Sequence, residues 1–258
     1  MKSHQVSALT NDPRRLIALE AVHNFRDLGG YPTKDGHTTK WRTLFRADGL
    51  YRLTPQDAQK VVDLGVQTVI DLRTPKEVQT RGTFPVAQFP VRFHHLPIID
   101  STWNDGKTPD IEDTVEFLVW AYREMLTHAS TKFSDALNLM GQSEVLPAVF
   151  HCAAGKDRTG MLAAFVLSIL GVHEDIISAD YGKTSEGIKR LIAWARINQP
   201  ELADAYTNMP ARFSASDPRA MATIIADLKT KHGSVTDYLR EIGVTQTTID
   251  SIRKRMLD

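Results

Sequence analysis

The sequence has 258 residues, enough for one domain with a substantial hydrophobic core. Its 31 Lys and Arg residues balance 31 Asp and Glu residues, and this zero net charge argues against nucleic acid or a charged membrane surface as partner. The single cysteine excludes a framework of internal disulfides.

No segment resembles a targeting or membrane-spanning sequence. The first 15 residues contain no apolar run typical of a signal peptide. The longest apolar stretch, around residues 161–172, is too short to cross a bilayer and is interrupted by Ser168. We therefore expect no integral membrane association and a cytoplasmic location, with export by a non-classical route as the alternative.

The first two thirds of the chain alternate between helix and strand signals. Thr54-Pro55 is typical of a helix start and Gly65 of a helix end. The predicted elements are a helix at 54–65, a strand at 66–72, a short helix from 74, a strand at 92–98, a loop at 101–110, helices near 115–126 and 131–141, and a strand opened by Pro147.

The last third is predicted to be almost entirely helical, with segments at 173–181, 185–197, a short helix from 200, and helices at 216–233, 234–243 and 245–257. Strands that alternate with helices indicate an α/β fold. We predict a single domain over residues 1–258, with a mainly parallel central sheet flanked by helices and a flexible segment at residues 1–14.

The only cysteine lies in the most informative motif of the chain, Phe150-His-Cys-Ala-Ala-Gly-Lys-Asp-Arg-Thr-Gly160. An apolar strand enters this motif, and the helix-forming residues 161–170 leave it. A strand, a tight loop and a helix N-terminus form a geometry that binds phosphate. Cys152 at the start of the loop is therefore placed to attack a bound phosphorus.

The residue types of the loop suit that chemistry. A helix N-terminus and a nearby arginine stabilise the thiolate of Cys152. Small residues at 153–155 let backbone amides of residues 153–158 approach an oxyanion. Arg158 offers a planar fork of donors to two phosphate oxygens, with Lys156 and Asp157 beside it. Thr159 is placed to hydrogen-bond the sulfur, and His151 is expected to hold the loop.

These residues predict a two-step displacement, in which Cys152 takes the phosphoryl group and water hydrolyses the phosphocysteine. The amides and Arg158 supply the electrostatic stabilisation, so neither a metal nor another cofactor is expected. Nine histidines show no metal-ligand spacing. The alternative is a buried, inert cysteine that happens to precede an arginine.

The sequence resembles the protein tyrosine phosphatase superfamily, and more narrowly the bacterial tyrosine/phosphoinositide phosphatases with the loop Cys-x-x-Gly-Lys-Asp-Arg-Thr-Gly. The resemblance also includes Asn24-Phe-Arg-Asp-Leu-Gly-Gly-Tyr31, Leu44-Phe-Arg-Ala-Asp48, Val69-Ile-Asp-Leu-Arg73 and Tyr238-Leu-Arg-Glu-Ile-Gly-Val244. It implies a cysteine-dependent phosphomonoesterase with Cys152 as nucleophile and Arg158 as phosphate-binding residue. Phosphotyrosine proteins and phosphoinositides are the implied substrates.

Two residues are candidates for the general acid that protonates the leaving group. Asp100 ends a predicted strand, where many relatives carry an aspartate on a mobile loop. Asp157 lies where the narrower group places an acidic residue of that role. The helix N-terminus and Arg158 favour ionised Asp157, whereas a bound phosphate dianion favours its protonated form. The choice between them stays open, and Asp105, Asp110 and Asp113 are more distant candidates.

Substrate choice has fewer signals. A lysine in this loop accompanies phosphoinositide substrates in the superfamily, so Lys156 is predicted to meet a second phosphate; a solvated surface lysine is the alternative. The aromatic and methionine residues of segment 185–215 are interpreted as core, with a wall or lid of the pocket as the alternative. Neighbouring ion pairs are predicted for Arg26/Asp27, Arg46/Asp48 and Asp71/Arg73.

The sequence thus predicts a phosphatase for phosphotyrosine, with activity toward phosphoinositides as well. Two other functions remain as alternatives. One is a pseudo-phosphatase that binds phosphorylated partners without hydrolysis, and the other is a sulfurtransferase that works through a Cys152 persulfide.

Overall fold

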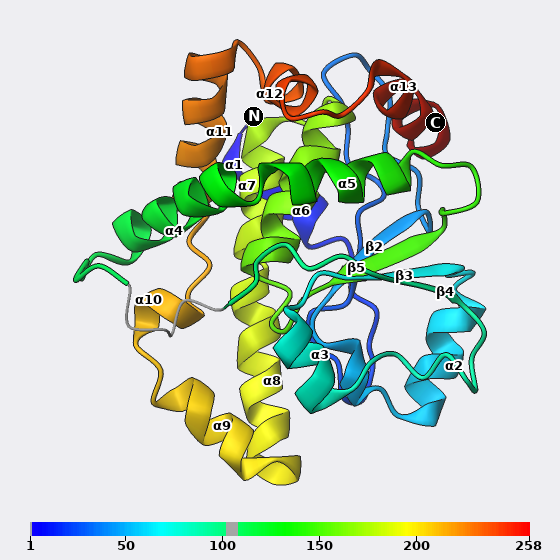
Figure 1. Cartoon of the computed structure of the whole chain (residues 1–258), viewed down its shortest axis with the longest axis vertical. Coiled ribbons are helices and arrows are strands. Elements are labelled where there is room, and N and C mark those ends of the chain that lie inside the picture. Colours follow the sequence, from blue (N-terminus) through cyan, green and yellow to red (C-terminus); the bar gives the residue numbers. More distant parts are fainter. Residues whose placement is uncertain (1, 102–107) are drawn as a thin grey trace.

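A five-stranded sheet lies at the centre of the structure, a computed structural model that describes residues 2–101 and 108–258 (Figure 1). The strands are β1 (Arg26–Asp27), β2 (Leu44–Ala47), β3 (Thr68–Asp71), β4 (Arg92–His95) and β5 (Ala148–His151). Their spatial order is β1-β2-β5-β3-β4. Only β1 and β2 pair in antiparallel fashion among these strands, which confirms the predicted mainly parallel sheet.

The helices of the described chain are α1 (Ser3–Thr10), α2 (Pro55–Asp63), α3 (Pro75–Arg81), α4 (Thr114–His128), α5 (Ser130–Met140), α6 (Asp157–Ile169), α7 (Glu174–Gly182), α8 (Thr184–Asn198), α9 (Pro200–Thr207), α10 (Ala211–Ser214), α11 (Pro218–His232), α12 (Val235–Glu241) and α13 (Gln246–Met256), with a 3-10 turn at Leu50–Arg52. The helical last third of the chain is therefore confirmed. None of these helices is both long enough and apolar enough to cross a lipid bilayer.

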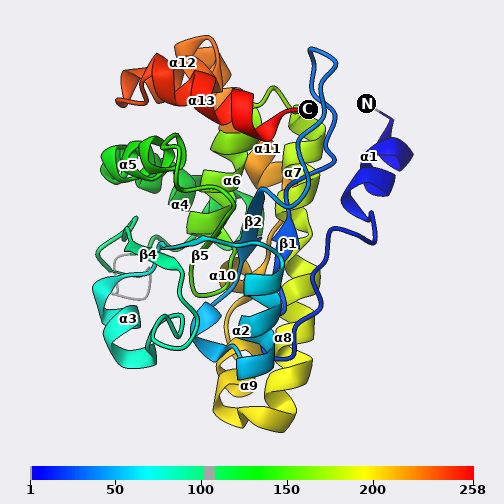
Figure 2. The ribbon, with the colours of Figure 1, turned by 90° about the vertical axis from the view of Figure 1, so that its right-hand side faces the viewer.

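Helices cover both faces of the sheet, because alternate residues of a strand point to opposite sides. Leu44, Ile70 and Phe150 pack into the larger core, formed with the C-terminal helices. Phe45 and Val149 pack into a smaller core on the other face, formed with α2. Figures 1 and 2 show α5 and α6 on one side of the sheet and α2 and α3 on the other. β2, β3 and β5 are buried on both faces, as in other parallel sheets, whereas the edge strand β4 is only partly buried.

The register of the sheet brings three strand ends together. His151 at the end of β5 pairs with Ala47 of β2 on one side and with Asp71 of β3 on the other. The loop that starts at Cys152 therefore leaves the sheet between the ends of two neighbouring strands. Ligands bind at this edge in open α/β sheets.

Two helices lie where the sequence predicts none. α1 falls in the segment for which flexibility is predicted; it packs against α7 and buries Val6 and Thr10. α10 is a single helical turn with no fully buried residue. Neither has the apolar periodicity that identified the other helices from the sequence.

Candidate active site

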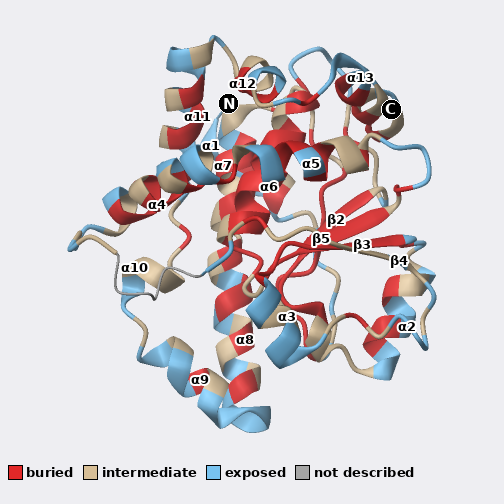
Figure 3. Cartoon of the chain, in the orientation of Figure 1, coloured by how far each residue is buried: buried red, intermediate tan, exposed pale blue. Residues whose placement is uncertain are grey.

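The loop of residues 152–156 joins β5 to the buried helix α6 (Figure 3). Cys152 is a free thiol with only 2% of its surface exposed. Gly155 has φ +66°, and a Cβ atom there would lie 2.5 Å from the carbonyl oxygen of Ala47. The glycine therefore lets the loop turn tightly against the end of β2.

Three groups donate hydrogen bonds to the backbone carbonyl oxygens of the loop. The side-chain amide of Asn24 donates to the carbonyl oxygens of Ala154 and Gly155, at 3.1 and 3.2 Å. Arg46 also donates to Gly155, at 2.9 Å, and the amide of Gly49 donates to Ala153. Among the described residues, no acceptor is bonded to the backbone N–H groups of residues 153–156. With the carbonyls engaged, these N–H groups are available to an oxyanion beside Cys152.

A buried ion network stabilises the arginines behind the loop. Asp180 of α7 pairs with Arg26 at 3.0 Å and with Arg46 at 2.6 Å, and it accepts a hydrogen bond from Tyr31. Burial raises the pKa of Asp180, but the charges of the two arginines outweigh it and hold that pKa far below its usual value. The carboxylate therefore stays ionised and fixes Arg46 against Gly155.

This network corrects two of the predicted ion pairs. Arg26 pairs with Asp180 rather than with Asp27, whose carboxylate accepts hydrogen bonds from the backbone of Gly29 and Arg42. Consecutive residues in a strand point to opposite faces, so Arg26 and Asp27 do not meet.

Arg46 likewise pairs with Asp180 and not with Asp48. Asp48 pairs instead with Arg52 at 2.5 Å and accepts the backbone N–H groups of His23 and Asn24. It thereby holds the segment that carries the loop-bracing Asn24.

The third predicted pair, Asp71 with Arg73, is confirmed at 2.5 Å. His151 lies next to this pair, with its Nε2 atom 3.6 Å from Asp71 and its Nδ1 atom 3.1 Å from the carbonyl oxygen of Cys152. Burial lowers the pKa of His151, which favours the neutral imidazole. These contacts fit the expected role of His151 in holding the loop.

Arg158 is held by a partner that sequence reasoning missed. Its guanidinium forms two hydrogen bonds with the carboxylate of Glu77 in α3, at 2.6 and 3.1 Å. Burial raises the pKa of Glu77, but the bonds from Arg158 outweigh it and hold that pKa below its usual value. Burial disfavours the charged form of Arg158, yet the charges of Cys152 and Glu77 hold its pKa above the usual range.

One sequence signal was available for Glu77. Thr74 and Glu77 form a capping box at the start of α3, in which each side chain bonds the backbone N–H of the other residue. The pattern Thr-Pro-Lys-Glu predicts this helix start. It does not predict the contact between Glu77 and Arg158, because the two residues are 81 positions apart in the sequence.

Asp157 is the first residue of α6 and accepts a 2.7 Å hydrogen bond from the hydroxyl of Tyr122 in α4. Tyr122 in turn bonds the hydroxyl of Tyr181 in α7. Both tyrosines are buried, whereas the side chain of Asp157 is 28% exposed. The Tyr122 hydroxyl thus fixes one carboxylate oxygen of Asp157, while the carboxylate as a whole remains in contact with solvent.

Asp100, the other candidate acid, is exposed, and no hydrogen bond or ion pair connects it to the described residues of the loop. Asp105 lies outside the described residues. The carboxylate of Asp113 accepts a hydrogen bond from the backbone N–H of Glu116 and thereby caps the start of α4. The structure therefore brings Asp157, but not Asp100, into contact with the loop residues described here.

Lys156 is buried, so the interpretation as a solvated surface lysine is wrong. Its ammonium group donates a 2.5 Å hydrogen bond to the carbonyl oxygen of Phe213 in α10 and lies 3.4 Å from Asp157. α10 thereby covers the loop from the outside.

The core interpretation of segment 185–215 is also wrong. Its aromatic and methionine side chains are only partly buried, namely Trp194, Tyr206, Met209 and Phe213, whereas the aliphatic Ile188 and Leu191 of α8 are buried. Burial raises the pKa of Tyr206 to about 12, and the charge of the Cys152 thiolate contributes to that rise. Because Phe213 of α10 accepts the hydrogen bond of Lys156, α10 lies on the outer side of the loop, and α9 precedes it in the chain; we call α9 and α10 the outer wall.

The hydroxyl of Thr159 is buried and has no hydrogen-bond partner among the described residues, so the expected bond to the sulfur of Cys152 is not formed. Within the same residues, no group of three His, Cys, Asp or Glu side chains is arranged to hold a metal ion.

The profile of the tyrosine phosphatase family matches residues 17–258. The chain therefore belongs to the tyrosine phosphatase family. It is 28% identical to the triple specificity protein phosphatase PtpB of Mycobacterium tuberculosis, over 93% of this chain and 98% of PtpB. It is 27% identical to the putative tyrosine-protein phosphatase H16_A0669 of Cupriavidus necator, over 90% of this chain and 87% of that protein. A tyrosine-protein phosphatase of Nostoc commune is also 27% identical, over 82% of this chain and 73% of the relative.

Proposed function

We propose that this protein hydrolyses phosphotyrosine through a phosphocysteine on Cys152. The observation that carries the proposal is the arrangement around the thiol. Cys152 starts a loop whose N–H groups have no acceptor among the described residues, and Arg158 is fixed beside it by Glu77. These donors suit a phosphate whose charge redistributes in the transition state. Relatives named as protein phosphatases, two of them as tyrosine-protein phosphatases, support the same reaction class.

In the first step, the thiolate of Cys152 attacks the phosphorus. The S–P bond forms as the bond between phosphorus and the phenolic oxygen breaks, and the leaving oxygen takes a proton from Asp157. Arg158 and the N–H groups of residues 153–156 hold the three non-bridging oxygens.

In the second step, a water molecule attacks the phosphocysteine. Asp157, now a carboxylate, accepts a proton from this water, and the S–P bond breaks to release phosphate and the thiolate. The cycle returns every group to its starting protonation state once phosphate has left.

We assign the acid role to Asp157 because Tyr122 fixes its geometry. The hydroxyl of Tyr122 bonds Oδ1 of Asp157, so Oδ2 remains to carry the proton for the leaving group. Removal of this bond is expected to weaken proton transfer without affecting phosphate binding by Arg158. Tyr122 is thus a positioning residue for the acid.

Phosphoinositides are the second substrate class that we propose. Lys156 supports this proposal. Among the described residues, its ammonium group contacts Asp157, at 3.4 Å, and donates one hydrogen bond, to a backbone carbonyl of α10. A second phosphate on the substrate replaces that carbonyl as its partner. We place the enzyme in the cytoplasm, since a reducing compartment preserves a reactive thiolate.

The proposal is tested by phosphate release from a phosphotyrosine peptide and from a short-chain phosphoinositide, side by side in EDTA. Cys152→Ser serves as the blank. Turnover of both substrates that depends on Cys152 supports a protein and lipid phosphatase, and turnover of the peptide alone restricts the function to phosphotyrosine. Phosphopeptide binding without any hydrolysis would instead identify a pseudo-phosphatase.

A further inference from the structure

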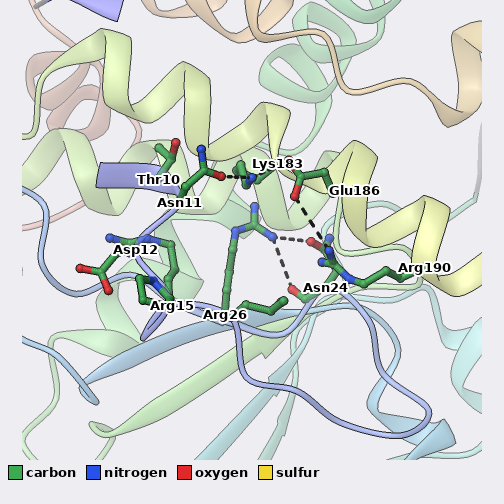
Figure 4. A pocket seen from close by; sticks show the side chains of 11 residues that line it. Thr10, Asn11, Asp12, Arg15, Asn24, Arg26, Lys183, Glu186 and Arg190 are labelled. Atoms are coloured by element: carbon green, nitrogen blue, oxygen red, sulfur yellow. Dashed lines mark hydrogen bonds and ion pairs between the residues drawn. The ribbon is translucent and has the colours of Figure 1, made fainter. Parts of the chain in front are cut away.

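A cavity of about 340 Å³ is lined by Arg26 and by Asn24, the residue that bonds the carbonyls of the catalytic loop (Figure 4). Its walls come from the chain after α1, from residues 24–26, and from the start of α8. The side chains of Arg26, Asn24, Lys183, Glu186 and Arg190 surround it in Figure 4. Such a volume holds a phosphate group together with a small organic group.

Positive charge dominates the lining, which contains four cationic side chains and two carboxylates, namely Arg15, Arg26, Lys183, Arg190, Asp12 and Glu186. One carboxylate, Asp12, is bonded at 2.7 Å by Arg14, which does not line the cavity. This arginine lowers the pKa of Asp12 to about 2. Glu186 is shared by Lys183, at 2.5 Å, and Arg190, at 3.9 Å. The mouth of the cavity therefore carries an excess of positive charge.

The buried part of the lining is also short of negative charge. Arg15 is 2% exposed and forms no ion pair with any described carboxylate; it donates to the carbonyl oxygens of Leu9 and Asp27. Arg26 shares the single carboxylate of Asp180 with Arg46. Burial and the charge of Arg26 lower the pKa of Arg46 to about 10. An added anion on this side of the loop would relieve that imbalance.

Asn24 connects the cavity to the catalytic loop. Its carbonyl oxygen accepts a hydrogen bond from Arg26, while its amide donates to Ala154 and Gly155. α8 also packs closely on it, since a Cβ atom at Gly187 would lie 2.9 Å from the Asn24 side chain. A ligand that binds Arg26 is therefore separated from the loop by one side chain.

We propose that this cavity is a second anion site, which binds a small phosphate-bearing molecule independently of Cys152 and Arg158. Lys183 and Arg190 contact the phosphate at the mouth, and Arg26, whose N–H groups already bond Asp180, Asn24 and Thr184, contributes its positive charge from within. The planar guanidinium groups suit phosphate oxygens better than a single ammonium does.

The site is tested with inorganic phosphate on the full chain, followed by amide shifts in two-dimensional NMR spectra. Two groups of amides are expected to shift with separate saturation curves. One group is residues 153–158 of the catalytic loop, and the other is residues 11–16 and 183–190 around the cavity. A titration with sodium chloride at equal ionic strength is the control for general salt effects.

The double variant Lys183→Gln/Arg190→Gln is expected to remove the second group of shifts and to leave the catalytic-loop shifts in place, which also shows that the protein is folded. Arg190→Gln alone weakens the second group. Arg196→Gln removes the same charge from an exposed position of α8 outside the cavity, and both groups persist. Shifts of the catalytic loop alone, or cavity shifts that survive the double variant or appear with chloride, would overturn the proposal.

A second arm identifies the ligand class. Cys152→Ser protein is titrated with inorganic phosphate and with glycerol 3-phosphate. Cavity shifts that saturate at lower concentration with glycerol 3-phosphate assign the site to a phosphate monoester, and equal or weaker binding assigns it to free phosphate. The absence of cavity shifts with both probes contradicts the site itself, whether or not the enzyme hydrolyses phosphotyrosine.

Discussion

The inner and outer sides of the active site are built in different ways. Behind the loop, Asp180 and Arg46 are buried and ion-paired, and Asn24 bonds two loop carbonyls. Outside the loop, α10 has no fully buried residue and α9 buries only Ala203 (Figure 3). The inner side is therefore preorganised for phosphate chemistry, and the outer wall has little packing to hold it in one position.

This difference separates two functions in space. In the proposed mechanism the reaction depends on Cys152, Arg158 and Asp157; Glu77 of α3 holds Arg158, and Tyr122 of α4 holds Asp157. We expect substrate choice to depend on the outer wall, which meets the loop through the Lys156–Phe213 hydrogen bond. Changes on the inner side are expected to affect every substrate, whereas changes to the wall are expected to affect substrates unequally.

The largest expected effect on activity is that of Arg158→Ala. Loss of its donors to the transition state is expected to lower kcat/KM about 10³-fold for all phosphomonoesters. Arg158→Lys keeps the positive charge but lacks the planar fork of donors, so its kcat/KM should lie between that of the unchanged protein and that of Arg158→Ala. Steady-state kinetics with nitrophenyl phosphate and a phosphopeptide provide the measurement, and a loss below tenfold would contradict the role of Arg158.

Glu77→Gln tests the support of Arg158 through stability. Loss of this partner, whose side chain is only 13% exposed, is expected to destabilise the protein by about 3 kcal/mol near neutral pH. Because the pKa of Glu77 is depressed in the folded state, its contribution is present above the ordinary value of about 4.3 and is lost as pH falls through the lower folded value.

Urea denaturation between neutral pH and acid pH measures this effect. The unfolding free energies of the unchanged protein and of Glu77→Gln should converge as the pH falls. Glu186→Gln is a matched control, since that carboxylate is 53% exposed and its loss should cost less than about 1 kcal/mol. A Glu77 effect that is as small as the control, or that does not change with pH, would contradict the assigned pair.

Asp157→Asn sharpens the comparison by separating acid catalysis from phosphate binding. The kcat/KM of a substrate with a poor leaving group is expected to fall about 10²-fold, whereas the kcat/KM of a substrate with a good leaving group, whose departure needs no acid, is expected to change little. Tyr122→Phe should show the same dependence on the leaving group with a smaller amplitude. If Asp100→Asn shows the selective loss instead, Asp100 is the acid.

Lys156→Ala tests the wall and has the smallest expected effect. Phosphoinositide turnover is expected to fall about tenfold, which corresponds to one hydrogen bond to a charged group. Nitrophenyl phosphate has no second phosphate and should be hydrolysed nearly as before. Equal losses for the two substrates would show that Lys156 serves the loop and not substrate choice.

The sequence predicted what depends on local pattern and missed what depends on distant contacts. The loop around Cys152 and the helix starts at Thr54 and Thr74 were predictable, because residue types and spacing define them locally. The partners of Arg26 and Arg46 were not, since Asp180 is more than 130 positions away. The same reason applies to the contacts of Glu77 and Tyr122. α10 was not predictable for a different reason, because its four residues are too few for a periodic pattern.

The most direct test of the account is to trap the covalent intermediate. The protein is mixed with a phosphotyrosine peptide, quenched rapidly in acid and digested, and the peptide that contains Cys152 is examined by mass spectrometry. We predict the added mass of one phosphoryl group on Cys152, more abundant in Asp157→Asn protein when the substrate has a good leaving group, because hydrolysis is slowed. Full turnover with no phosphoryl group on Cys152 at any quench time, in either protein, would contradict the account.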